Sequence, residues 1–171
     1  MSRLELIIEK IKSDWSVARS ASHFGEKCPF MLRSHFSNGI TSDAILELFP
    51  KSTIELIGMW EIFEHAELFK DDKYGQWGIE ILPPLEAAEE TEYQKTIRCN
   101  DLLEGDIVFG RFYGDSDLLM MSPKGEIYVI LPMDERNYWP KAANSVDEFL
   151  QKLMMSEGAK FWEKKPNQAS S

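Results

Sequence analysis

Cysteine is scarce in this sequence, and long apolar runs are missing. The two cysteines, Cys28 and Cys99, are too few for a disulfide framework and fit a reducing compartment. No apolar run approaches the roughly 20 residues that a membrane-spanning helix needs, and the charged N-terminus is typical of an amphipathic helix, not of a signal peptide. We therefore expect a cytoplasmic protein with no membrane contact; whether the two cysteines pair stays open.

Motifs of common catalytic sites are also missing. The sequence contains no GxGxxG, P-loop, GxSxG or HExxH pattern. His23 and Cys28 lie five residues apart without a second such pair, so a closed zinc site is not expected. His65 is better interpreted as a surface histidine near a helix end than as a general base, and Cys99 as a small buried side chain. We expect no enzymatic activity, no cofactor and no metal.

Acidic side chains are abundant, and they are unevenly distributed. The chain has 29 acidic and 19 basic residues, a net charge of −10. Residues 1–40 are net +2, residues 41–99 net −8 and residues 100–171 net −4. Because a nucleic-acid binder needs positive charge, direct contact with nucleic acid is not expected. The acidity favours a basic protein partner that is attracted over a distance, although it is also compatible with a role in solubility alone.

Apolar residues at helical spacing predict a first helix over residues 3–18. Residues 20–40 mix small, polar and aromatic side chains and are expected to form an irregular packed loop. Ser42 is expected to cap a short helix that ends at Leu48. Ser52 with Glu55 forms a capping box for the next helix, and an acidic helix is expected from Leu85 to about Gln94.

Strands are expected at residues 66–69 and 76–82, and three more at 107–113, 117–122 and 126–131. Gly114, Asp115 and Asp117 are predicted to form a structural turn in which the side chains bond the backbone and not a cation, and Gly125 a second turn. A last helix is capped by Ser145 with Glu148, and it should bury Phe149 against the sheet.

Helices, then strands, then a closing helix indicate an α+β fold. We expect an antiparallel sheet of about five strands with helices packed mainly on one face. The expected organisation is one domain over residues 1–165, in which residues 1–40 are an N-terminal helical extension, followed by a frayed tail at 166–171.

The segment from Asp106 to Leu150 resembles a known protein family. The segments IVFGRFYGDSDLLMMSPKGEIYVIL, RNYW and SVDEFL resemble, in that order, the SUKH superfamily of the Smi–Knr type. The features shared are a strand leading into Gly114-Asp115, a hairpin glycine and a capped helix. The similarity extends more loosely over residues 42–155, and Phe49-Pro50 stands where the family usually has Leu-Pro.

The resemblance implies a protein that binds another protein. Many bacterial members resemble immunity proteins, which protect the producer by binding a secreted toxin domain, often a nuclease; eukaryotic members look like regulatory scaffolds. The leading hypothesis is therefore an immunity protein for a basic toxin, and the alternative is a regulatory or scaffold module. A small-molecule binder or an enzyme is a third possibility, which an apolar cavity with convergent polar groups would favour.

Candidate partner-binding residues follow from charge and residue type. Exposed Trp, Tyr and Arg dominate binding energy at interfaces, so Tyr138 and Trp139 are candidate apolar anchors; the alternative for Trp139 is that it closes the edge of the core. Carboxylates that could imitate phosphates of a nuclease substrate are Asp71, Asp72, Glu86, Glu89, Glu90 and Glu92.

Overall fold

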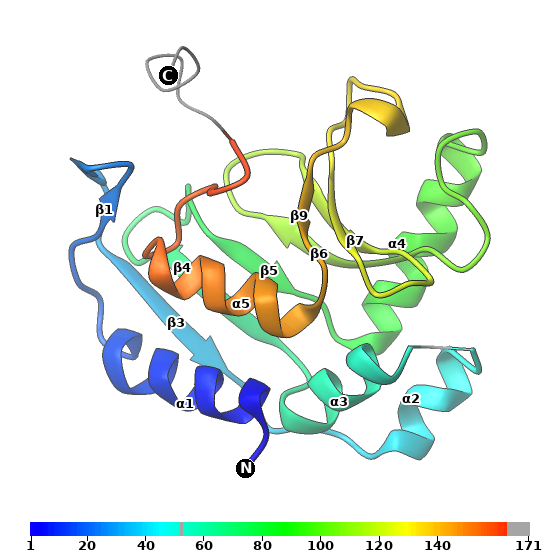
Figure 1. Ribbon diagram of the computed structural model, residues 1–171, viewed down its shortest axis with the longest axis horizontal. Coiled ribbons are helices and arrows are strands. Elements are labelled where there is room, and N and C mark those ends of the chain that lie inside the picture. The colour runs from blue at the N-terminus through cyan, green and yellow to red at the C-terminus, as the bar shows by residue number, and fades with distance from the viewer. Residues whose placement is uncertain (52, 164–171) are drawn as a thin grey trace.

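A seven-stranded antiparallel sheet organises the structure, a computed structural model that describes residues 1–51 and 53–163 (Figure 1). Each strand lies beside the next one in the chain. The strands are β3 (Leu32–Phe36), β4 (Ala66–Asp71), β5 (Ile79–Ile81), β6 (Ile107–Phe112), β7 (Leu118–Met121), β8 (Ile127–Ile130) and β9 (Lys141–Ala143). The α+β class is thus confirmed, and the three strands from β6 to β8 are consecutive antiparallel neighbours as expected.

The expected number of about five strands is wrong, because both edges of the sheet were missed. At one edge β3 pairs with β4, and at the other the short β9 pairs with β8. Residues 20–40 are therefore not an irregular loop: they also contain a hairpin of β1 (Ser22–His23) and β2 (Glu26–Lys27). Because Leu32 in β3 is fully buried in the main core, the segment expected as an extension is part of that core.

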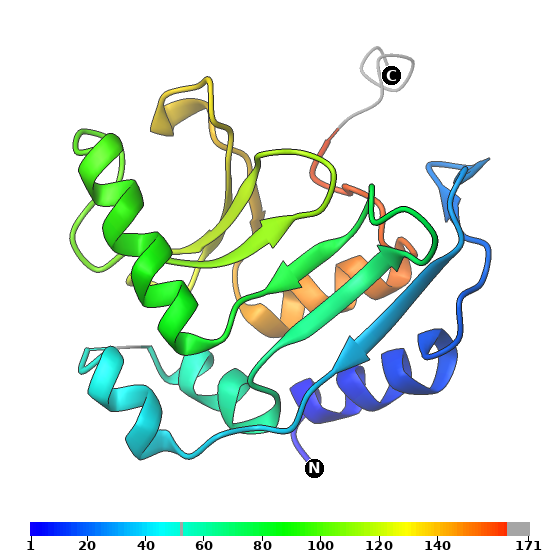
Figure 2. The ribbon, with the colours of Figure 1, turned by 180° about the vertical axis from the view of Figure 1, so that it is seen from behind.

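The helices lie on both faces and at one end of the sheet. Figure 2 shows α1 and α5 behind the sheet, while α4 crosses the other face in front of β6. The short helices α2 and α3 lie together at one end, and α2 contacts α4. The bounds are α1 (Arg3–Trp15), α2 (Ser42–Leu48), α3 (Ile54–Ile62), α4 (Pro84–Ile97), the 3₁₀ turn η1 (Arg136–Tyr138) and α5 (Val146–Met155). Among the residues that the structure describes, no helix is both long and apolar enough to cross a membrane.

The helix caps lie close to the expected positions. Thr41, one residue before Ser42, caps α2 through its side chain, and Thr53 caps α3. The expected cap Ser52 lies outside the described residues, as does the tail at 166–171. Ser145 caps α5 by accepting a hydrogen bond from the Glu148 backbone N–H.

Two hydrophobic clusters hold the sheet between its helices. The larger cluster joins the sheet to α1, α3 and α5, and it buries Phe149 as predicted. The smaller one lies on the α4 side of the sheet and consists of Leu102, Val108, Leu118, Met120, Ile130 and Trp139. The smaller cluster does not extend to β3, β4 and β5, and no helix covers the outer face of these three strands (Figure 2).

Candidate protein-binding surface

Helix α4 exposes its large apolar side chains and buries its small ones. Leu85, Tyr93 and Ile97 are 56%, 59% and 54% exposed. They lie on one side of the helix, since residues four apart share a face. The buried side consists of Pro84, Ala87, Thr91 and Gln94. This distribution is the reverse of an ordinary surface helix, in which the apolar stripe faces the core.

The buried side of α4 can be small and polar because it bonds directly to a strand. The Thr91 hydroxyl accepts a hydrogen bond of 2.9 Å from the Val108 backbone N–H in β6. The pairing of β6 with β7 shifts register between Val108 and Gly110, and the Thr91 bond satisfies the Val108 donor there. Holding α4 in place therefore does not depend on its exposed apolar residues.

Three carboxylates lie on the exposed side of α4 together with these apolar residues. Glu86 and Glu89 make no hydrogen bond or ion pair with the residues that the structure describes, and Glu92 is 3.4 Å from Lys95 of the same helix. Glu90 differs, because it is partly buried and accepts a hydrogen bond of 3.3 Å from Arg111 of β6. The α4 surface is defined here as Leu85, Glu86, Glu89, Glu92, Tyr93 and Ile97.

The loop around η1 borders the C-terminal end of α4. Arg98, which follows α4, donates to the carbonyl of Pro132 and lies 5.9 Å from the Trp139 ring. Trp139 is buried in the smaller cluster and donates to the Asp134 carbonyl, so its expected role as an exposed anchor is wrong. Trp139 therefore takes the alternative place, in the smaller cluster at the edge of the core. Tyr138 is 67% exposed and stays available to a partner.

Asp71 is not a surface carboxylate either. Its side chain is buried and accepts hydrogen bonds from the backbone N–H groups of Lys73, Tyr74 and Gln76, which shapes the loop between β4 and β5. Asp72 is exposed but accepts a hydrogen bond of 3.0 Å from Arg33. Since α4 begins near the opposite end of β5, the structure does not bring these two residues to the α4 surface.

The Gly114 and Gly125 turns are present, as the sequence predicted. Gly114 has a φ of +86°, and the Asp115 carboxylate accepts from the Asp117 backbone N–H at 2.9 Å. Gly125 closes the second turn with a φ of +84°. Sequence reasoning missed Lys160, whose ammonium group lies 2.5 Å from Asp115 and 3.9 Å from Asp117. Burial and the neighbouring Asp115 raise the pKa of Asp117.

An ionic network covers the outer face of β3, β4 and β5. Glu67 of β4 bonds Arg33 of β3 at 3.2 Å and Lys70 at 2.5 Å. Burial alone would raise the pKa of Glu67, but these two cations outweigh it and lower the pKa to about 2. The signal in the sequence was the alternation of charged and apolar residues along β4 and β5, which is typical of a half-exposed sheet.

The histidines and cysteines differ in part from their expected environments. His65 lies between the end of α3 and the start of β4, near a helix end as expected, but its imidazole is half-buried and lies 2.9 Å from the Glu80 carboxylate of β5. Cys99 is exposed, contrary to expectation, while Cys28 is buried; both thiols are free. Burial raises the pKa of Cys28. In the described part of the chain, no three His, Cys, Asp or Glu side chains lie close enough together to hold a metal ion.

Comparison with known proteins assigns the chain to no family. No model of a known protein family matches the chain, and none of the curated proteins compared with it matches either. The resemblance to the SUKH superfamily stays a prediction from the sequence.

Proposed function

We propose that this protein is a SUKH-type immunity protein that binds and neutralises a cognate toxin domain, a basic nuclease, through the α4 surface. The net charge of −10 suits a basic partner. The resemblance over residues 42–155 supplies the biological context, since bacterial members of that family resemble immunity proteins. Binding by surface contact requires no catalytic group in this chain.

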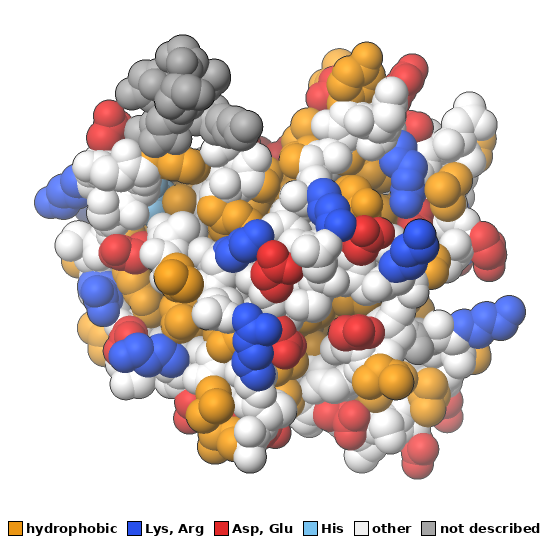
Figure 3. Space-filling model, in the orientation of Figure 1, with side chains coloured by type: hydrophobic (Ala, Val, Ile, Leu, Met, Phe, Trp, Pro, Cys, Tyr) orange, Lys and Arg blue, Asp and Glu red, His pale blue; other side chains and the backbone are white. Residues whose placement is uncertain are grey.

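The observation that carries the proposal is the reversed side-chain distribution of α4. Leu85 and Tyr93 are exposed to solvent, although α4 has another side that is buried against the sheet. Aromatic residues at the centre of a contact, surrounded by polar groups, are typical of binding hot spots. The unpaired carboxylates of Glu86 and Glu89 beside them would be neutralised by a basic partner. On the face that Figure 3 shows, over α1 and α5, basic and acidic side chains alternate, so charge there favours neither kind of partner.

The test measures association with the toxin domain encoded beside this protein. The wild type is compared with a variant carrying Glu86→Gln and Glu89→Gln, at salt concentrations from about 0.05 to about 1 M, over which the Debye length falls from about 14 Å to about 3 Å. Glu90 is left unchanged because it bonds Arg111. The matched control carries Glu9→Gln and Glu61→Gln, which removes the same charge from α1 and α3.

We expect the α4 variant to associate more slowly at low salt, with the difference narrowing as salt screens the charges. The control variant should associate nearly like the wild type, because its charges lie away from α4. Equal rates for all three proteins at every salt concentration would contradict the proposed surface. Binding to a non-toxic cellular protein, without protection against a toxin, would support the regulatory or scaffold alternative.

A further inference from the structure

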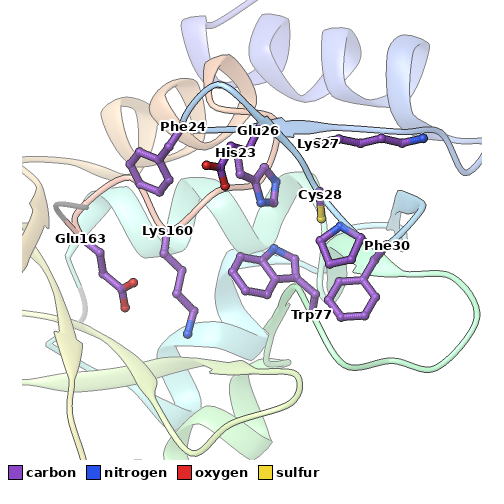
Figure 4. A pocket seen from close by; sticks show the side chains of 10 residues that line it. His23, Phe24, Glu26, Lys27, Cys28, Phe30, Trp77, Lys160 and Glu163 are labelled. Atoms are coloured by element: carbon purple, nitrogen blue, oxygen red, sulfur yellow. The ribbon is translucent and has the colours of Figure 1, made fainter. Parts of the chain in front are cut away.

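A cleft of about 360 Å³ lies between the β1–β2 hairpin and the turn that follows α5. Its walls are mostly apolar, and Figure 4 shows Trp77 at its centre with His23 above the indole and Lys160 to one side. Phe24 lies in the turn between β1 and β2, Phe30 follows β2, and the two face the cleft from opposite sides. The volume lies at the small end of the range for ligand pockets, so it suits one ring system.

The two central rings of the cleft are held in fixed positions. Trp77 donates from Nε1 to the Gly158 carbonyl at 3.0 Å, and His23 bonds the Glu157 carbonyl at 2.9 Å through Nε2. The two rings lie 5.4 Å apart. A hairpin with two-residue strands is not stable by itself. The His23 bond and a bond of 3.3 Å from the Ser22 N–H to the Glu157 carboxylate tie this hairpin to the turn after α5. The site is therefore formed before any ligand arrives.

Backbone strain is concentrated at this place. Among the described residues, the non-glycine residues with positive φ are Phe24 at 54°, Phe69 at 50° and Glu157 at 55°. Phe24 lines the cleft, and Glu157 holds His23. Phe69 packs so closely on Gly158, the residue that holds Trp77, that a Cβ there would lie 2.4 Å from the Phe69 Cβ. Left-handed backbone is costly for bulky residues and occurs preferentially at functional sites.

The polar groups of the cleft indicate the chemistry of the ligand. The charged side chains that line the cleft are two of each sign, Glu26, Glu163, Lys27 and Lys160, so the cleft favours neither a cation nor an anion. The ammonium group of Lys160 lies 5.4 Å from the Trp77 ring centre and is paired with Asp115. Because the partner of His23 Nε2 is a carbonyl, Nε2 is the donor, and Nδ1 of the neutral imidazole can accept. We propose that the cleft binds a neutral aromatic ring with an N–H or O–H group at its edge, of the indole or phenol class.

The first test compares two ligands that differ only in the donor. Calorimetry at pH 8 with the full chain should show indole binding with a dissociation constant below about 1 mM, as expected for a small ligand in a fitted cleft. N-methylindole should bind about five-fold more weakly, since it loses one hydrogen bond. In NMR spectra, indole should shift the side-chain N–H signal of Trp77, while that of Trp139 should stay unchanged.

A variant at the hairpin tip separates the binding role of Phe24 from its structural role. Phe24→Asn removes the ring and places at a φ of 54° a residue that tolerates this conformation better. The variant should bind indole at least about ten-fold more weakly than the wild type while it keeps a cooperative thermal transition, which shows that it is folded. Tyr138→Asn, an exposed aromatic in the η1 loop, is the matched control and should bind like the wild type.

A third ligand distinguishes whether the aromatic ring belongs to a protein side chain or to a free small molecule. If N-acetyl-tryptophanamide binds as indole does, the cleft accepts a tryptophan side chain of a protein; if only indole binds, the ligand is a free small molecule. Two results would overturn the proposal: no saturable binding of indole or 4-methylphenol up to about 10 mM, which is weaker than a fitted cleft should give, or an affinity that Phe24→Asn leaves unchanged with no shift at Trp77.

Discussion

The hydroxyl of Thr91 joins α4 to β6 by accepting the N–H of Val108 at 2.9 Å and donating to the Ala87 carbonyl at 2.7 Å. Both hydrogen bonds of the hydroxyl are buried, and both are made with backbone groups. A helix fixed in this way needs no large apolar residue on its inner side. This bond is the reason that α4 can present large side chains to solvent.

Replacement of Thr91 by Val keeps the shape of the side chain and removes the hydroxyl. The Val108 N–H would then be buried without a partner, which costs about 1–3 kcal/mol. We expect Thr91→Val to lower the free energy of unfolding in urea by that amount. Thr91→Ser retains the hydroxyl, so it should lower the free energy of unfolding clearly less than Thr91→Val does. A Val variant as stable as the wild type would show that the bond does not hold α4.

The sequence predicted those elements whose residues follow one simple periodicity. Strands β6, β7 and β8 were found because short apolar runs define them, and helix α5 because Ser145 caps an apolar stripe at helical spacing. Strand β3 was missed because Arg33, Ser34 and His35 make it polar, and its place depends on pairing with β4. The contact of Lys160 with Asp115 joins residues 45 apart and has no local signal.

The candidate surface was predicted only in part, because charge alone does not reveal burial. Glu86, Glu89 and Glu92 do lie on one exposed side of α4, as their spacing indicates. Asp71 is also acidic, but its backbone partners are three residues of its own loop, and their geometry appears only in the folded chain. The exposed apolar residues of α4 were not recognised, because spacing alone does not say which side faces the sheet.

The ion pairs of Glu67 should make stability depend on pH in acid. The folded pKa of about 2 lies below the ordinary value of 4.5, so the stabilisation is fully present above about pH 4.5 and is lost as the pH falls through 2. The loss in Glu67→Gln at pH 7 should be about 1–3 kcal/mol, after allowance for solvent screening.

The measurement for Glu67 is urea unfolding of wild type and variant between pH 7 and pH 2. The difference in unfolding free energy between the two proteins should be constant down to about pH 5 and then shrink, because the Glu67 carboxylate of the unfolded wild type takes up a proton at a higher pH than that of the folded protein. Glu86→Gln, which removes an unpaired exposed carboxylate, should show no such trend. A difference for Glu67→Gln that stays the same at pH 2 would contradict the assigned ion pairs.

Arg136 compensates a fully buried carboxylate. The Asp106 side chain is 0% exposed, and its Oδ2 lies 2.5 Å from Arg136 Nη1. Arg136→Met would leave this charge without its cation, which typically costs about 3–5 kcal/mol. Arg98→Met removes a cation whose hydrogen-bond partners, the Pro132 carbonyl and the Gln94 side-chain oxygen, carry no charge, so it should cost much less. Equal losses in chemical denaturation would mean that Arg136 acts only by packing against Trp139.

The exposed apolar residues of α4 should contribute little to folding if they serve binding. Leu85→Ser and Tyr93→Ser should each change the free energy of unfolding by no more than about 0.5 kcal/mol, as is usual for surface positions. Leu102→Ser, in the smaller core cluster, is the comparison and should cost about 2–5 kcal/mol, because it removes a buried side chain. With the cognate toxin domain, the two α4 variants should dissociate faster, since loss of apolar contacts acts mainly on the dissociation rate. Stability losses at Leu85 and Tyr93 that match the loss at Leu102 would assign these residues to the fold and remove the argument for a binding surface on α4.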